Sequence, residues 1–528
     1  LGVLNADQNP MTSSISDYNN DGFQDIIASV FSEGLYVYYG STDGYDEEKF
    51  TKIDFPNRYL TSRSISFYDL DEDGDLDLFC GNWSIGKGEG NISYKSSSDF
   101  FILNHIDSLT LVKTNYPQGA TLTSLFWDKD GNSKKELFIG IDFEQPDWST
   151  SDFDLTKSLE EKNLPYSTHT TMSATAADIN NDLRQDLFLA QIAEKSLQGN
   201  DMTKDVDQIC DCFKDTPYLV ECQKIVQGRQ NTRQAIATGN FKVLPQKQKA
   251  SAYKTFLLAE INRRKSQAKG ISKELEEYSR GLGLWNFVHD STNIYNDYDK
   301  KNMESKLYLE QKRDLNLLFM NDGSKLVDQT KAFKLNKGGW TWNAQFEDLN
   351  NDEFVDLFMV NGSGRLAANQ SSFFYINKSG QTFEEIGKEV GLSNYLSSQS
   401  YTYIDYDNDG DIDIAVLSEG GPVLLFENNL NSSNSIQFEL DNGLTNSSII
   451  GAEIYIYYGD SSLHQMREIR QSGGYQSYNP TTVHFGLGRH QQISKAVIAW
   501  NDGDSTVINQ PLKAGYKYWI GKITDKKE

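Results

Sequence analysis

Short apolar stretches recur along the chain, and each one directly follows a polar, acidic loop. The stretches IIASV, LFCGN and LFLAQ begin one residue after Asp25, Asp77 and Asp186, and segments such as SISFY and YTYI precede the loops. Apolar, β-branched runs of this length between turn residues are typical of buried strands. The pattern therefore predicts strand–loop–strand units, some of which continue through a turn into a further strand, as after Asn321 and Asn377.

The loops themselves form a repeat. Six nine-residue loops carry an oxygen-bearing side chain at positions 1, 3, 5 and 9, and they begin at Asp17, Asp69, Asp128, Asp178, Asp348 and Asp405. Four of the intervals between loop starts are 50 to 59 residues, and the remaining one is 170. A period in this range indicates a propeller or another repeat array. Four strands in a unit of this length match one propeller blade.

The long interval contains one unit and an extra stretch with a different pattern. Tyr253, Phe256, Leu257 and Ile261 recur at helical spacing within this stretch, which predicts an α-helical insertion. We therefore expect a mainly β protein, a six- or seven-bladed β-propeller with an α-helical insertion and a C-terminal β-module. The predicted division is residues 1–192 for the first part of the propeller, 193–311 for the insertion, 312–440 for the rest of the propeller and 441–528 for the module.

Composition narrows the functional classes. The chain has 528 residues and a formal net charge of −25, and such an acidic surface disfavours nucleic acid as a partner. We predict no transmembrane segment, because no apolar run approaches the ~20 residues of a membrane helix. Four cysteines are too few for a disulfide framework. A disulfide from Cys222 to Cys210 or Cys212 remains open, and Cys80 is predicted to be a core thiol.

Alternating oxygen ligands in a tight loop converge on one point and favour Ca²⁺ over softer metals such as zinc. An EF-hand would need a bidentate Glu at position 12, where the first loop has Ala28 and none of the six loops has Glu. The loops close instead on position 9, and by analogy with such loops position 7 contributes a backbone carbonyl. The predicted calcium ligands are Asp17, Asn19, Asp21, Phe23 and Asp25; Asp69, Asp71, Asp73, Asp75 and Asp77; Asp128, Asp130, Asn132, Lys134 and Glu136; Asp178, Asn180, Asp182, Arg184 and Asp186; Asp348, Asn350, Asp352, Phe354 and Asp356; and Asp405, Asp407, Asp409, Asp411 and Asp413.

Position 6 is predicted to separate stronger loops from weaker ones. Three loops have glycine there, which accepts a positive φ without strain, whereas the other three have Ser133, Leu183 and Glu353. These three residues are expected to weaken the geometry or change the turn. The alternative is that the loops are Asx-turn hairpins that need no metal. This alternative would explain a single loop, but it does not explain why the same spacing recurs in six loops. Because crowded carboxylates repel each other without cations, calcium is expected to be structural.

These loops resemble those of the FG-GAP/VCBS repeat family, whose calcium loops lie between propeller strands. The C-terminal part, with IIGAEIYIYYGD, REIRQSGGYQSYNP and VHFGLGRHQQISKAVIAWNDGD, resembles the ASPIC/UnbV module that follows such repeats. The residues that fit this module are Gly451, Gly473, Gly474, Tyr475, Ser477, His484, Phe485, Gly486, Leu487, Gly488, Trp500 and Gly503. The resemblance implies an exported protein, extracellular or at the cell surface, that acts as a protein- or ligand-binding scaffold. It further implies a protein partner, such as an outer-membrane transporter or assembly complex.

No catalytic constellation is recognisable, so we predict a binding protein. The six histidines show no metal-site spacing, and HFGLG lacks the spacing of a phosphate loop. The sequence starts at Leu1 without the regions of a signal peptide, which favours a processed or trimmed start. The alternative function is a secreted polysaccharide lyase or hydrolase that uses a propeller face. Two roles are open for Trp83, Trp127, Trp148, Trp340 and Trp342. They form a platform on which a carbohydrate stacks, or they pack in the core, which is the commoner role of such residues.

Overall fold

The computed structural model describes residues 10–192, 316–441 and 449–522, apart from 150–163, 363–370 and interruptions of at most four residues. All regular elements in these ranges are β-strands. The predicted helical insertion, residues 193–311, lies outside the described residues. Within the described part, no helix is long and apolar enough to cross a membrane.

Six antiparallel sheets follow one another in chain order, each built from strands that are consecutive in sequence. In the second sheet, β7 pairs with β6 beside the main path of strands. The strands of sheets one to three are β1 (Pro10–Ser16), β2 (Asp25–Val30), β3 (Gly34–Tyr38) and β4 (Phe50–Ile53); β5 (Leu60–Tyr68), β6 (Asp77–Gly88), β7 (Asn91–Tyr94), β8 (Phe100–Asn104) and β9 (Leu109–Lys113); and β10 (Thr121–Trp127), β11 (Glu136–Ile141) and β12 (Trp148–Ser149). Those of sheets four to six are β13 (Thr171–Ala177), β14 (Asp186–Gln191), β15 (Leu317–Asn321) and β16 (Leu326–Asp328); β17 (Thr341–Glu347), β18 (Asp356–Asn361), β19 (Phe373–Asn377) and β20 (Phe383–Glu385); and β21 (Ser398–Ile404), β22 (Asp413–Ser418) and β23 (Leu424–Phe426).

Consecutive sheets pack face to face, with their first strands next to one another. Between sheets two and three, Phe79 and Phe101 meet Phe126 in one buried cluster. Similar apolar clusters fill the spaces between sheets three and four, four and five, and five and six. Trp127 is fully buried in one of them, with 0% of its surface exposed. The second strands are buried on both faces, which explains their continuous apolar sequences.

A C-terminal module follows the sixth sheet. It contains the sheets β27–β24–β32 and β26–β25–β29–β30 and the pair β28–β31, with β24 and β32 parallel. Its strands are β24 (Asn434–Asp441), β25 (Glu453–Tyr458), β26 (Leu463–Glu468), β27 (Val483–Gly488), β28 (Gln492–Ile493), β29 (Lys495–Ala499), β30 (Ser505–Ile508), β31 (Leu512–Lys513) and β32 (Lys517–Gly521). The predicted boundary at residue 441 falls at the end of β24, although β24 pairs with module strands. The HFGLG stretch forms most of strand β27.

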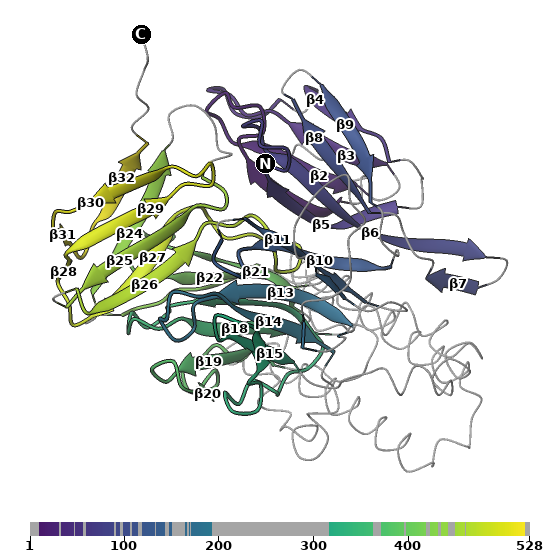
Figure 1. Ribbon diagram of the computed structural model, residues 1–528. Helices are drawn as coiled ribbons and strands as arrows, with labels where there is room; N and C mark the ends of the chain where they lie inside the picture. The colour runs from purple at the N-terminus through teal and green to yellow at the C-terminus, as the bar shows by residue number, and fades with distance from the viewer. Residues whose placement is uncertain are drawn as a thin grey trace, which may run out of the picture.

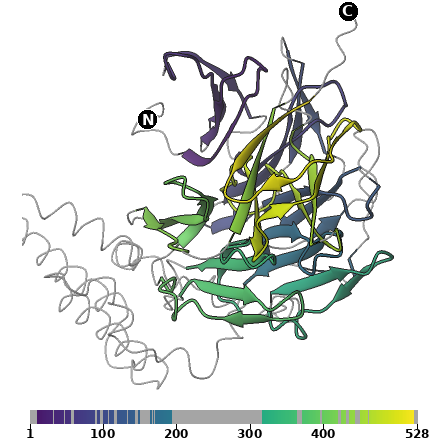
Figure 2. The same cartoon turned by 90° about the vertical axis from the view of Figure 1, so that its left-hand side faces the viewer.

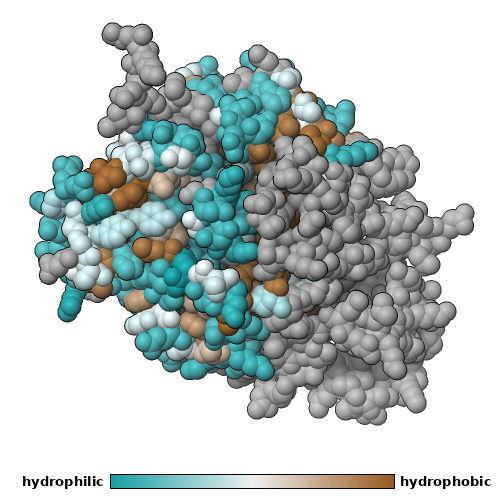
Figure 3. Space-filling model, viewed as in Figure 1, coloured by the Kyte–Doolittle hydropathy of each residue, from teal (hydrophilic) through white to brown (hydrophobic). Residues whose placement is uncertain are grey.

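The module shares one core with the first two sheets. Ile27 and Leu35 of sheet one and Phe67 of sheet two belong to the same buried cluster as Ile436 and Phe485 of the module. Figure 1 shows the module strands (yellow) beside the sheets. In Figure 2 the sheets follow one another around these strands, from purple through blue and teal to green. Hydrophobic and hydrophilic residues are interspersed over the module on the face shown in Figure 3.

Residues 469–482, which join β26 to β27, lie among the first strands of the sheets; we call them the central segment. The inner edge of each first strand faces away from the second strand, and its free backbone groups need hydrogen-bond partners. The central segment contacts all six first strands through Gln471 Nε2–Ile15 O (2.9 Å), Phe67 N–Gln471 O (3.0 Å), Gly473 N–Ser124 O (2.5 Å), Gly474 N–Ala174 O (2.9 Å), Tyr475 N–Asn343 Oδ1 (3.2 Å) and Thr402 Oγ1–Tyr478 O (2.9 Å).

Candidate metal centres

The six acidic loops occupy the same place in each sheet. Each loop connects the first strand to the second, and its position-9 residue is the first residue of the second strand, as with Asp25 in β2 and Asp413 in β22. The predicted strand–loop–strand units are therefore confirmed. In loops one, two, four and five, the backbone N–H groups of positions 5 and 6 donate to the position-1 carboxylate. In loop five, the backbone N–H groups of Asp352 and Glu353 donate to the Asp348 carboxylate at 3.1 and 2.9 Å.

Position 6 keeps the same turn in two of the loops without glycine. Leu183 and Glu353 have φ of 65° and 88°, close to the 89° of Gly22 in loop one. The expectation of a changed turn is therefore wrong for these two loops, in which a non-glycine residue adopts a strained, positive φ. In loop three, Gly131 at position 4 has a φ of 73° and donates its N–H to Asp128 at 2.7 Å. Ser133 itself lies outside the described residues.

In loops one, two, four, five and six, the position-9 carboxylate connects its own loop, at position 2, with the end of the third strand or the residues just after it. In loop five, Asp356 accepts the N–H of Leu349 at position 2 (3.2 Å) and the N–H of Asn377 at the end of the third strand (2.8 Å). The corresponding carboxylate in loop six, Asp413, accepts bonds from Tyr406 and Asn428. Backbone N–H groups therefore hold the position-9 carboxylate in place without the help of a metal ion.

Two loops bring three carboxylates together. The oxygens of Asp69, Asp71 and Asp77 in loop two lie within 4.8 Å of one another, as do those of Asp405, Asp407 and Asp413 in loop six. Loops one, four and five have Asn at position 3 and offer an amide oxygen there instead. His105, the residue after β8, contacts loop two: its Nδ1 lies 2.8 Å from Asp73 Oδ2. In loop four, the Arg184 side chain forms an ion pair with Asp182.

Some of these oxygens are buried without a hydrogen-bond donor. In the part of the chain that the structure describes, two oxygens at predicted ligand positions have no partner: Asn180 Oδ1 at position 3 of loop four and Asp405 Oδ1 at position 1 of loop six. Buried polar atoms are normally satisfied, and unsatisfied hard oxygens suit a hard cation such as Ca²⁺. The donor set therefore fits calcium.

Burial raises the pKa of several candidate ligands. Loss of solvent raises the pKa of Asp77 to about 7 and that of Asp178 to about 7. For Asp69, burial comes first and repulsion from Asp73 and Asp71 adds to it, with a resulting pKa of about 6. A bound divalent cation would favour the ionised carboxylates and offset this cost.

The C-terminal module contacts loops five and six. Gln437 Nε2 donates to Asp405 Oδ2 at 2.8 Å, and the Ser435 hydroxyl donates to Gly410 O at 2.7 Å, both in loop six. In loop five, His484 Nε2 lies 2.6 Å from Asn351 Oδ1. Burial lowers the pKa of His484 to about 3, so the ring is neutral at this contact.

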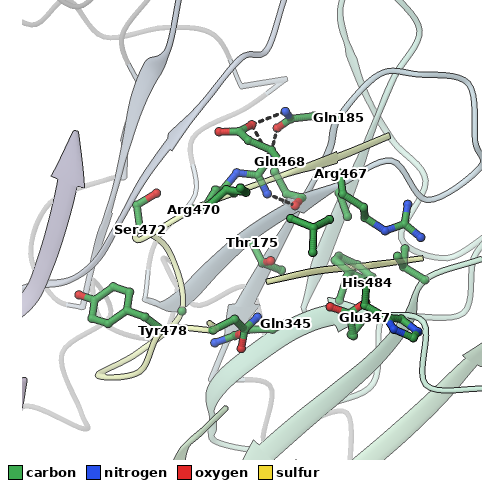
Figure 4. A pocket seen from close by; sticks show the side chains of 18 of the residues that line it. Thr175, Gln185, Gln345, Glu347, Arg467, Glu468, Arg470, Ser472, Tyr478 and His484 are labelled. Atoms are coloured by element: carbon green, nitrogen blue, oxygen red, sulfur yellow. Dashed lines mark hydrogen bonds and ion pairs between the residues drawn. The ribbon is translucent and has the colours of Figure 1, made fainter. Parts of the chain in front are cut away.

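Buried charges join the module to loops three and four. Lys135, directly before position 9 of loop three, lies 3.0 Å from Glu453 Oε1 and 3.4 Å from Glu468 Oε1. Arg470 donates to Glu468 Oε2 at 2.8 Å and to Gln185 of loop four. Figure 4 shows Gln185, Glu468 and Arg470 around a pocket between the module and the sheets. This network fixes the module to two neighbouring loops.

The pocket in Figure 4 is a cavity of about 120 Å³. Arg467, Glu347 and His484 line it, and Arg467 Nε and His484 Nδ1 have no hydrogen-bond partner within the described residues. Burial raises the pKa of Glu347 to about 7, and the nearby Arg467 opposes this rise. The space is polar and suits ordered water.

Sequence reasoning missed a set of asparagines that connect the loops. Each lies at the end of the third strand of its sheet or, for Asn428, two residues beyond it, and donates through its side-chain amide to a backbone carbonyl of the preceding loop. A signal was present, because the third strands end in the similar stretches FILN, LFMN, FYIN and LFEN. These asparagines are Asn104, Asn321, Asn377 and Asn428.

Three of the tryptophans, Trp83, Trp340 and Trp342, pack against one buried cluster that includes Tyr475 of the central segment. Trp340 and Trp342 stack at 5.8 Å, and Trp342 lies 5.0 Å from the ring of Tyr475 in the central segment. The Arg63 guanidinium lies over Trp83 at 5.2 Å. Trp127 belongs to the core, as the packing interpretation predicts, and the side chain of Trp148 lies outside the described residues.

The fold and the loops together define a β-sheet repeat protein with an acidic loop in each repeat. Residues 17–80 and 348–416 match the FG-GAP-like repeat family, and residues 443–527 match the ASPIC and UnbV family. The chain thus carries FG-GAP-like repeats and a C-terminal ASPIC/UnbV domain, as the resemblance indicated.

Other comparisons are remote. No curated protein matches the chain. Among solved structures, the crystal structure of the V. cholerae biofilm matrix protein Bap1 is similar over 36% of this chain and 36% of that chain, with 15% sequence identity and a TM-score of 0.19. The match thus spans about a third of that chain's length.

Proposed function

We propose that the six sheets are the blades of a calcium-stabilised β-propeller, and that the protein is an exported scaffold that binds other proteins at a cell surface. The observation that carries the calcium proposal is the equivalence of the six loops. Each joins the first and second strands of its sheet with oxygens at alternate positions, and two buried ligand oxygens, Asn180 Oδ1 and Asp405 Oδ1, have no donor within the described residues.

Calcium would be structural in this protein. The ligands of each loop come from consecutive positions and hold the first two strands of one sheet, so a bound ion stabilises that sheet locally. Binding to the folded state alone adds about 2.7 kcal/mol per site when free calcium is 100-fold above Kd. Several sites together would therefore raise the unfolding temperature substantially.

The test combines stoichiometry with stability. Calorimetric titration of chelator-treated protein is expected to show up to six calcium equivalents, and the unfolding temperature should rise with calcium more than with equal magnesium. The variant Asp407→Ala, which removes one ligand of loop six, should lose one equivalent. Val423→Ala, an exposed residue of the same sheet (65% exposed), should lose none. An unchanged unfolding temperature after chelation would contradict the proposal.

The scaffold role follows from what the module and the loops already contact. Within the described residues, the C-terminal module contacts loops three to six, and the central segment lies among the first strands of the six sheets. We propose that the insertion, residues 193–311, supplies the docking surface for a protein partner, since long connections on a rigid scaffold commonly carry binding function. Its place in the chain supports this proposal, because it joins β14 to β15 within one sheet.

Affinity purification tests the docking proposal. Tagged full-length protein and a variant with residues 193–311 replaced by a short linker are recovered from native membranes under calcium. The linker variant is expected to lose its companions while keeping the calcium-dependent unfolding temperature of the full chain. Recovery of the same companions by both proteins would contradict a docking role for the insertion.

A further inference from the structure

Four asparagines connect neighbouring acidic loops around the sheets. Asn428, two residues after β23, donates its side-chain amide to Leu349 O of loop five at 2.8 Å and to Ile412 O of loop six at 3.2 Å. Its backbone N–H donates to Asp413 Oδ1, the position-9 carboxylate of loop six, at 2.7 Å. One residue therefore binds two loops that belong to different sheets.

The same arrangement recurs at the other three positions. In each, the amide binds the position-2 carbonyl of the preceding loop and the position-8 carbonyl of its own loop, while the backbone N–H binds position 9. The amide bonds are Asn104 to Tyr18 O (2.8 Å) and Leu76 O (3.3 Å), Asn321 to Lys129 O (2.6 Å) and Gln185 O (3.2 Å), and Asn377 to Ile179 O (3.0 Å) and Val355 O (3.0 Å).

Burial makes these bonds specific to an amide. Asn104 and Asn377 are 2% and 1% exposed. If either amide were removed, the loop carbonyl groups that it binds would have no water molecule to replace it. Both N–H groups of the amide donate to carbonyls, which an aspartate in the same place could not do. The bonds therefore hold the two loops in one fixed relation.

Position 4 adds a second link at two of the loop pairs. Asn20 of loop one donates to Asp75 Oδ1 of loop two at 2.7 Å, and Asn181 of loop four donates to Glu353 O of loop five at 3.0 Å. Of the asparagine bonds described above, those that join loop five to loop six are the bonds of Asn428. This pair therefore offers the simplest test of an asparagine link.

We propose that these asparagines couple neighbouring calcium sites, so that filling one loop raises the calcium affinity of the next. The inference rests on the proposed calcium binding. Closing a loop around an ion fixes the backbone at positions 2 and 8, and the asparagine bonds to these positions in two loops at once. A loop whose neighbour is already ordered then loses less conformational freedom when it binds calcium. Couplings of typical size change affinity by 5- to 150-fold.

The experiment measures loop five while loop six is disabled. Hydrogen–deuterium exchange of peptides covering residues 348–356 is followed across calcium concentrations in the full-length protein, which gives a midpoint for loop five alone. Asp409→Ala removes the position-5 ligand of loop six and should raise this midpoint about fivefold or more. Asn428→Ala should abolish the effect of Asp409→Ala on loop five. Val423→Ala is the matched control and should leave that effect intact.

The outcomes separate the coupling from calcium binding itself. Calcium-dependent protection of loop five with no effect of Asp409→Ala overturns the coupling and leaves the proposed function standing. An effect of Asp409→Ala that persists in Asn428→Ala also overturns it, because the connection then runs through other contacts. An absence of calcium-dependent protection in the parent protein overturns the proposed function. The Asp409→Ala comparison needs no change at Asn428, so it remains decisive if that variant does not fold.

Discussion

The substitution Gly473→Ala tests whether the central segment holds the sheets together. Gly473 has a φ of 79°, and an added Cβ would lie 2.7 Å from Ala174 O and 3.0 Å from Leu125 Cδ1. The Ala174 oxygen belongs to the backbone of β13 and cannot rotate away. The segment would have to move, which strains its bonds to Ser124 O and Ala174 O.

The expected loss of stability has three sources. A left-handed backbone costs alanine about 1–2 kcal/mol, overpacking of a tight site costs about 1–3 kcal/mol, and a weakened hydrogen bond about 1 kcal/mol. We therefore expect Gly473→Ala to lower the free energy of unfolding by about 3–5 kcal/mol. Exchange of backbone amides in β10 and β13 should accelerate together with that change.

A matched control isolates the packing part of this effect. Gly503 has a φ of 87° in a module turn, and an added Cβ there meets nothing within 4 Å. Gly503→Ala should therefore lose only about 1–2 kcal/mol. Both variants are compared by denaturant unfolding in calcium, followed by tryptophan fluorescence. Equal losses in the two variants would refute the structural role of the central segment.

Three further predictions concern buried charge and backbone strain. Lys135→Met removes the cation 3.0 Å from Glu453 in a buried network and should lower the free energy of unfolding by about 3–5 kcal/mol, whereas the exposed neighbour variant Lys134→Met should lower it by less than about 0.5 kcal/mol. Because burial raises the pKa of Asp77 to about 7, well above its unfolded value, the folded calcium-free protein binds more protons than the unfolded chain between about pH 4 and 7. Its unfolding temperature in chelator should therefore fall as the pH rises from 5 to 8, and a rise would contradict the assignment of burial as the cause. Leu183→Asn should raise the free energy of unfolding by roughly 1 kcal/mol, since Asn tolerates a positive φ; a decrease in denaturant midpoint would show that packing of the leucine outweighs the strain.

Much of the repeat region could be predicted from the sequence because its information is local. Strand polarity, loop position and ligand spacing are all set within about twenty residues, so Asp69 and Asp405 could be placed correctly without a fold. The turn at Leu183 could not, because its unfavourable φ is imposed by the bonds of residues 182 and 183 to Asp178. Local propensity alone therefore does not predict a positive φ at this leucine.

The six acidic loops, the strands around them and the presence of a C-terminal module follow from the sequence alone, although the predicted boundary at residue 441 left β24 outside the module. Only the tertiary structure placed the central segment among the first strands, Lys135 beside Glu453, and Asn428 between two loops. Asn428 and Leu349 are 79 residues apart in the sequence, and Lys135 and Glu453 are 318 residues apart. Such contacts depend on how whole sheets are arranged around the module, and no periodicity along the chain records that arrangement.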